Sequence, residues 1–188
     1  MFSLGVGYHK RFKMERPLAG LPRAMLPCGY GAVAWNADLL EAHAEVLAGC
    51  FRGSQDAILF PSLGSRDGCA HLLAEVVRRK GFIPEATWLI VGPEGPCGTI
   101  QALRERIGLA AIQNVGILPA HQNKGLGRAL LLRSLGGMVD TGYGRVLLEV
   151  TADNFPALRL YSGLGFRRTR VIYKAVPLRA GDDSAIVI

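Results

Sequence analysis

The chain has 188 residues, a formal net charge of +7 and 49% hydrophobic residues, so it can build a core and a disordered protein is excluded. It contains no run of about 18 apolar residues and no signal-peptide pattern at its start, which excludes a helical membrane protein and an exported one. We therefore expect a soluble, cytoplasmic protein of one domain, with no membrane partner.

Two short segments carry much of the positive charge. Residues 10–16 hold four basic side chains against Glu15, and a second basic group lies at 167–174. No long basic helix with interleaved aromatic residues accompanies them, so the sequence disfavours a nucleic-acid partner. We expect residues 1–20 to form a basic N-terminal arm and residues 21–188 to form a single domain.

The first half of this domain predicts a strand or strand pair over 23–35, two helices and a hairpin. Asn36 can cap a helix over 37–50, and Ser65 can cap a second helix that ends before Gly81. Two apolar stretches then indicate an antiparallel hairpin, with strands over 87–92 and 97–103. His43 and His71 lie on the predicted helices, where we expect surface positions.

Strands and helices alternate in the second half. The pattern predicts a strand (108–117), a helix (125–138), a strand (145–150), a helix (154–164) and a final strand (166–176). The order as a whole is that of an α/β protein with a mixed sheet.

The four cysteines stand far apart in the sequence. They include no Cys-x-x-Cys pair, so neither a zinc site nor a dense disulfide framework is indicated. We expect four reduced and mostly buried thiols (Cys28, Cys50, Cys69 and Cys97).

The junction between the strand at 108–117 and the next helix carries a possible anion site. Gly125 and Gly127 open the helix, and backbone N–H groups at a helix start bind phosphate well. Lys124 and Arg128 would add positive charge. A plain glycine turn into an amphipathic helix explains the same residues, and neither the dinucleotide fingerprint nor a Walker loop is present.

The helix predicted at 154–164 carries two further candidates. Asn154 and Tyr161 are seven positions apart, which places both side chains on one helix face. Each also has a structural explanation: Asn154 can cap the helix, and Tyr161 can pack in the core.

Taken together, these motifs closely resemble the GNAT superfamily of acyl-coenzyme A dependent N-acetyltransferases. The resemblance rests on Gln122-x-x-Gly125-x-Gly127 before a helix, Leu148-Glu149-Val150 in a strand, Asn154-x-x-Ala157-x-x-x-Tyr161, and Leu164-Gly165-Phe166. It implies the GNAT fold, a mixed central sheet flanked by helices with two early helices before the hairpin. The cofactor-binding core would span about residues 108–166.

The resemblance also implies acetyl-CoA as co-substrate and no metal. Carried over residue by residue, it assigns cofactor binding to a strand, to the loop after it and to one asparagine (Val115, Gly116, Ile117, Gln122, Asn123, Lys124, Gly125, Leu126, Gly127, Arg128 and Asn154). His121, in the same loop, is expected to contact solvent or phosphate.

For catalysis, the resemblance makes Tyr161 the general acid that protonates the departing thiolate. Glu149 is the candidate base, because ribosomal-protein N-terminal acetyltransferases of the superfamily have a glutamate at the same spacings from the asparagine and the tyrosine. A structural role for Glu149 in the sheet stays open. No carboxylate occurs between 108 and 118, where histone-type members carry their base.

The expected function is acetyl transfer from acetyl-CoA to a primary amine by direct attack. The alternative is a catalytically inactive GNAT module that binds an acyl-CoA as a sensor or scaffold, and a nucleic-acid-binding module is a third hypothesis. The acceptor, a small molecule or a peptide, does not follow from the sequence. The resemblance also allows a homodimer.

Overall fold

The computed structural model describes residues 6–177, which form two compact parts. The larger part comprises residues 16–148, and the smaller part combines the two ends of the chain, up to residue 15 and from residue 149 on. Strand β6 (Arg145–Thr151) begins in the larger part and ends in the smaller one.

The larger part contains a mixed sheet. Strands β2 (Gly31–Ala34), β3 (Trp88–Gly92), β4 (Gly95–Arg106) and β5 (Leu109–Ile117) pair antiparallel in this order. The start of β6 then pairs parallel with the start of β5. The predicted hairpin and the mixed α/β class are thus confirmed. The strand expected over 23–35 forms only as the four residues of β2.

Both predicted early helices form, each with the expected cap. The Oδ1 atom of Asn36 accepts from the Asp38 N–H at a single 3-10 turn (Ala37–Leu39), and α1 (Leu40–Phe51) follows. The Ser65 hydroxyl accepts from the Gly68 N–H and opens α3 (Arg66–Arg78). A short helix that the sequence did not suggest, α2 (Gln55–Leu59), lies between them.

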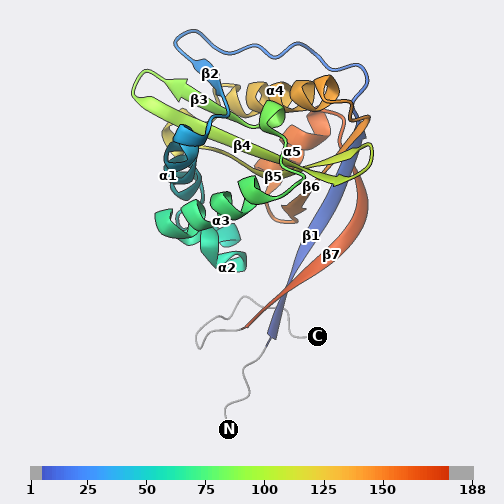
Figure 1. Cartoon of the computed structure of the whole chain (residues 1–188). Coiled ribbons are helices and arrows are strands. Elements are labelled where there is room, and N and C mark those ends of the chain that lie inside the picture. Colours follow the sequence, from blue (N-terminus) through green and yellow to red (C-terminus); the bar gives the residue numbers. More distant parts are fainter. Residues whose placement is uncertain (1–5, 178–188) are drawn as a thin grey trace. The chain divides into compact units, whose positions relative to one another are not determined.

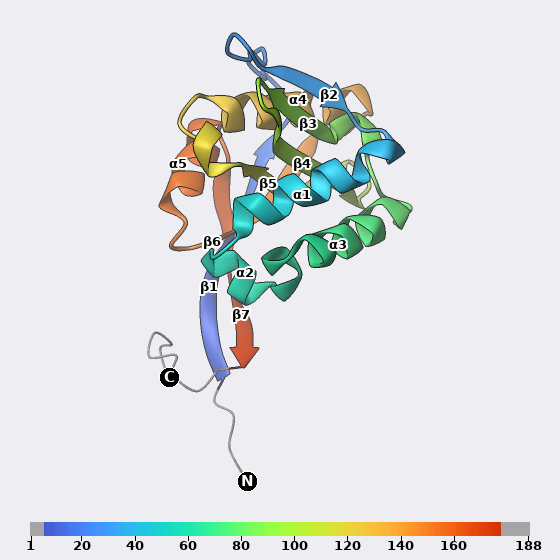
Figure 2. The ribbon, with the colours of Figure 1, turned by 90° about the vertical axis from the view of Figure 1, so that its left-hand side faces the viewer.

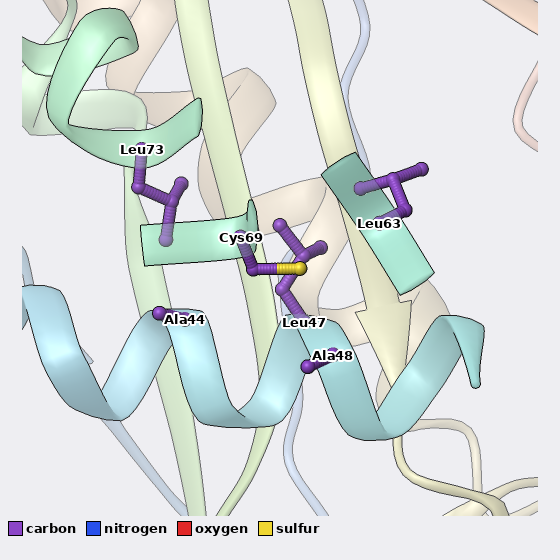
Figure 3. Close-up of a cluster of buried hydrophobic side chains, with 6 residues drawn as sticks. All are labelled: Ala44, Leu47, Ala48, Leu63, Cys69 and Leu73. Carbon is purple, nitrogen blue, oxygen red and sulfur yellow. The ribbon is translucent and has the colours of Figure 1, made fainter. Parts of the chain in front are cut away.

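Helices α1 and α3 lie side by side and share an apolar core (Figures 1 and 2). Figure 3 shows this cluster, in which small side chains alternate with leucines so that the two helices approach closely (Ala44, Leu47, Ala48, Leu63, Cys69 and Leu73). Leu47 and Leu73 are fully buried, and each contributes about 1.5–3 kcal/mol by leaving water.

Helix α4 (Leu126–Asp140) packs on the sheet and on the 3-10 turn η3 (Pro84–Ala86). The Ser134 hydroxyl donates to the Ala86 carbonyl oxygen at 2.6 Å. A Cβ atom at Gly137 would collide with the Glu85 carbonyl oxygen. The far end of α4 is therefore held against backbone that has little room to yield.

The smaller part holds β1 (Val6–Pro17, except its last two residues), the end of β6, α5 (Phe155–Gly163) and β7 (Arg167–Pro177). Much of the expected N-terminal arm is therefore a strand. It pairs antiparallel with β7 from Val6 to Glu15, and the Ala152 N–H donates to the Lys10 carbonyl oxygen. Charged residues interrupt the apolar alternation of β1, which hides the strand in the sequence.

Candidate functional site

The loop between β5 and α4 ends in a helix start that no side chain caps. Two residues take left-handed backbone angles, Asn123 at φ 61° and Gly125 at φ 79°, and they turn the chain into the helix. The first bond within α4 runs from the Ala129 N–H to the Gly125 carbonyl oxygen. The N–H groups of Leu126 and Gly127 thus have no partner inside the helix, which suits an anion.

This loop is held in place by a tyrosine from the chain's early part. The Tyr30 hydroxyl lies 3.0 Å from His121 Nδ1, and Lys124 Nζ donates to the same hydroxyl at 3.3 Å. Lys124 Nζ also donates to the Ala120 carbonyl oxygen, and Gln122 Nε2 donates to the Ile117 carbonyl oxygen. Lys124 is exposed, so its charge stands beside the helix start.

His121 corrects an expectation. We expected this side chain to contact solvent or phosphate, but it is buried and its ring is bound to Tyr30. Tyr30 is 91 residues earlier in the chain, and no sequence pattern connects the two.

Strand β5 offers a second feature that a ligand can use. It pairs with β6 only through Leu109, Ala110 and Ala111, whereas it pairs with β4 up to Ile117. From Ile112 onward, the backbone edge that faces away from β4 has no ladder partner in the larger part. Val115, Gly116 and Ile117 therefore lie on a strand segment whose backbone groups can bind an extended ligand.

Gly116 has a packing role beside its expected cofactor role. A Cβ atom there would lie 2.7 Å from Cys50 Cβ and 2.8 Å from Cys50 Sγ. The glycine thus lets α1 approach β5. Burial, with Cys97 and Cys69 nearby, raises the pKa of the Cys50 thiol to about 12, so this thiol stays protonated and is a poor nucleophile.

A buried polar cluster lies between α1 and β4. His43 Nδ1 is 2.7 Å from the Thr99 hydroxyl, and Gln101 Nε2 donates to that hydroxyl at 2.6 Å. Gln101 Nε2 also lies 3.2 Å from His43 Nδ1. Because the amide nitrogen can only donate, His43 Nδ1 is an acceptor and the imidazole proton is on Nε2.

His43 is fully buried, so the expectation of a surface histidine was wrong. Burial lowers the pKa of His43 from 6.5 to about 4, and the ring is therefore neutral at pH 7. Trp35 packs on it with ring centroids 5.2 Å apart. Neither Nε2 of His43 nor Oε1 of Gln101 has a hydrogen-bond partner.

The remaining candidates belong to the smaller part. Glu149 is an exposed residue of β6. Asn154 Oδ1 accepts from the Ala157 N–H at 3.2 Å, so this asparagine does cap α5. Tyr161, on α5, is 7% exposed and packs on Phe166 with ring centroids 5.9 Å apart.

The candidates thus fall into two groups. Val115–Ile117 and Gln122–Arg128 follow each other from β5 into α4 within the larger part, and Glu149, Asn154 and Tyr161 lie in the smaller part.

Other features bear on the kind of site. Within residues 6–177, no group of three or more His, Cys, Asp or Glu side chains is arranged to hold a metal ion. No helix in this range is both long and apolar enough to cross a bilayer. All four cysteines are free; Cys69 and Cys97 are buried and Cys50 partly so, as expected of mostly buried thiols, whereas Cys28 is exposed.

The chain is similar to known acetyltransferases in sequence. Residues 65–166 match the model of the Acetyltransferase (GNAT) family. A mycothiol acetyltransferase of Parafrankia sp. is 30% identical over 184 residues, which is 83% of this chain and 54% of that protein. Another, of Nocardioides sp., is 50% identical over 173 residues, covering 81% and 55%. The [ribosomal protein bS18]-alanine N-acetyltransferase of Escherichia coli K12 is 34% identical over 79 residues, covering 42% and 53%.

Solved structures share the fold at lower identity. A GCN5-related N-acetyltransferase from Sphaerobacter thermophilus superposes with a TM-score of 0.68 at 21% identity, covering 90% of this chain and 51% of that one. The ribosomal-protein-S18-alanine N-acetyltransferase from Escherichia coli gives 0.60 at 19% identity, covering 82% and 97%.

This chain spans only 54% and 55% of the two mycothiol acetyltransferases. The matched segment nevertheless runs from the start of α3 through α4 to the end of α5, and so includes the whole loop between β5 and α4. The sequence match, the mixed sheet and the uncapped start of α4 agree, and the chain belongs to the Acetyltransferase (GNAT) family.

Proposed function

We propose that the chain transfers an acetyl group from acetyl-CoA to a primary amine. The observation that carries the proposal is the uncapped start of α4, which comes one loop after a strand segment whose outer backbone edge has no ladder partner in the larger part. A ligand with an extended amide-containing arm and a pyrophosphate matches this pair of features. Acetyl-CoA has both groups.

In this proposal, the larger part binds the co-substrate. The backbone of Val115–Ile117 bonds the pantetheine arm, and the N–H groups from Gly125 to Arg128 bind the pyrophosphate, with Lys124 contributing charge. The donors fit the group, because two left-handed residues and a glycine-containing first turn leave the backbone accessible to a bulky anion. Gln122 holds the loop to Ile117, and Asn123 shapes it.

The chemistry is a direct displacement. The amine nitrogen attacks the thioester carbonyl carbon, the new C–N bond forms and the C–S bond breaks. Tyr161 gives its phenolic proton to the leaving sulfur, and Glu149 takes the proton that the attacking nitrogen loses, directly or through water. Asn154 contributes a contact to the co-substrate through the part of its amide that does not cap α5.

A covalent route through a thiol is not part of the proposal. Cys50 is adjacent to Gly116, but its raised pKa leaves almost no thiolate at neutral pH. The acceptor is proposed only as an amine. The relatives are named for mycothiol and for an alanine of ribosomal protein bS18, so small amines and alanine-starting peptides are both suitable trial acceptors.

The test is thiol release from acetyl-CoA by the purified chain, measured with a panel of small amines and peptides. Acetylated product that forms in step with free thiol, and forms about 10–1000-fold more slowly in Tyr161→Phe, supports the proposal. Binding of acetyl-CoA by calorimetry without turnover on any acceptor would instead favour the sensor or scaffold hypothesis. Absence of acetyl-CoA binding would refute the assigned loop.

A further inference from the structure

The two basic segments of the sequence come together in one two-stranded ribbon. Strands β1 and β7 pair antiparallel over ten registered positions, from Val6 opposite Pro177 to Glu15 opposite Arg167 (Figure 1). Lys10, Arg167, Arg168 and Arg170 are exposed, and Glu15 is the only carboxylate residue on either strand. This ribbon is a concentrated cationic surface within the smaller part, and acetyl transfer as proposed does not use it.

One face of the ribbon also presents aromatic rings. Residues opposite each other in an antiparallel pair share a face, and Tyr8 is opposite Ala175 while Lys10 is opposite Tyr173. Tyr8 is 50% exposed and Tyr173 is 60% exposed. Val6 and Val171 are on the same face and about half exposed. We call the side chains of Tyr8, Lys10 and Tyr173 the ribbon face.

Two cations lie on the same face. The Arg168 guanidinium lies 4.0 Å from the ring centroid of Phe12, and Lys10 Nζ lies 5.5 Å from it. Phe12 itself is buried, so these contacts hold the two cations over the ribbon. The face that carries the two exposed phenol rings thus also carries two positioned charges.

The charges restrict what can bind. Strand β7 ends the sheet order, and arginine and lysine side chains along an edge strand discourage addition of another protein strand. A second copy of this chain pairing through β7 would bring arginines against like charges, which destabilises a sheet pair. A polyanion with flat apolar groups, in contrast, matches both the charges and the rings.

We propose that the ribbon face, together with Arg168, binds single-stranded nucleic acid. Bases stack on Tyr8 and Tyr173, and the phosphates bind Lys10 and Arg168, which lie on the same face. Stacking on aromatic side chains accepts every base, so we expect little sequence preference. Binding weakens with salt because each phosphate contact releases counterions.

The experiment measures fluorescence anisotropy of a labelled oligouridylate of about 12 nucleotides with the full chain. An oligothymidylate and a duplex of equal length distinguish RNA, DNA and double strands. We expect the single strands to bind with a Kd of about 1–100 µM at physiological salt, and more tightly at lower salt.

Two pairs of variants separate stacking from charge. Tyr8→Leu with Tyr173→Leu keeps apolar surface but removes stacking, and should weaken binding by at least about tenfold, whereas the two Tyr→Phe changes should restore it. Lys10→Gln with Arg168→Gln should make the logarithmic salt dependence shallower by about 1.4, for two lost phosphate contacts.

Arg104→Gln with Arg106→Gln removes the same charge at the exposed end of β4 and serves as the control. It should leave affinity nearly unchanged, and thermal melting checks that every variant is folded. Equal losses in the control would show a general charge effect and refute the proposal. Failure of the single strands to bind would also refute it. The same holds if the chain prefers phosphatidylserine vesicles or a polyglutamate peptide to the single strands. A dimer in sedimentation that disappears with Tyr8→Leu would likewise refute it.

Discussion

Acid should destabilise the larger part through His43. The pKa of this imidazole is lowered from 6.5 to about 4 by burial, and its Nδ1 atom accepts from the Gln101 amide nitrogen. Between these two pH values the unfolded chain binds a proton at this position and the folded chain does not. The free energy of unfolding therefore falls as pH falls, by about 1.4 kcal/mol per pH unit and about 3 kcal/mol in all.

Urea unfolding at a series of pH values from 7 down to 4 measures this for the wild type and for His43→Gln. Glutamine can keep a bond to Thr99 but does not titrate, so the difference between the two stability curves should shrink as the pH falls below 6.5. His71→Gln, at an exposed histidine of α3, is the control and should give a curve parallel to the wild type. A constant difference for His43→Gln, or an NMR titration midpoint for His43 near 6.5, would refute the reasoning.

The proposed catalytic and binding residues give three further predictions. Tyr161→Phe should lower kcat by about 10–1000-fold in the thiol-release assay with acetyl-CoA affinity nearly intact, and unchanged kcat would remove the phenol from the mechanism. Glu149→Gln should lower turnover less at high pH, where more of the amine is already deprotonated; a loss equal at every pH, with a lower Tm, would indicate a structural role. Gly125→Val should abolish acetyl-CoA binding in calorimetry, because a β-branched residue strains at φ 79°. Gly136→Ala, at an open helical site, should bind normally.

Local signals predicted most of the secondary structure. Helix starts were marked within a few residues by the caps Asn36 and Ser65 and by Gly125. The buried face of α4 was marked by its apolar periodicity. The loop from β5 to α4 was likewise predicted as an anion site, because glycines and a lysine before an apolar helix are adjacent in the sequence.

Contacts between distant residues could not be predicted in this way. Tyr30 and His121 meet because each lies just outside a strand of the same sheet, Tyr30 before β2 and His121 after β5. The burial of His43 depends on how α1 lies on β4, where the partners Thr99 and Gln101 are 56 and 58 residues away. The pairing of β1 with β7 joins the two ends of the described chain, and neither strand has an uninterrupted apolar alternation.

Gly137 and Ser134 fix where the start of α4, the proposed phosphate site, lies, although they are toward its other end. Twelve residues of helix separate Gly137 from Gly125, about 18 Å of nearly rigid rod. A helix that is displaced at one end moves as a whole. A larger side chain at position 137 would therefore shift the N–H groups at the start of α4, to which the proposed ligand binds. A mutational scan that scores only ligand affinity would then report position 137 among the binding residues. In this fold, a loss of ligand affinity on substitution therefore does not by itself show that the residue contacts the ligand. The position should first be compared with the contacts that hold each helix against neighbouring backbone.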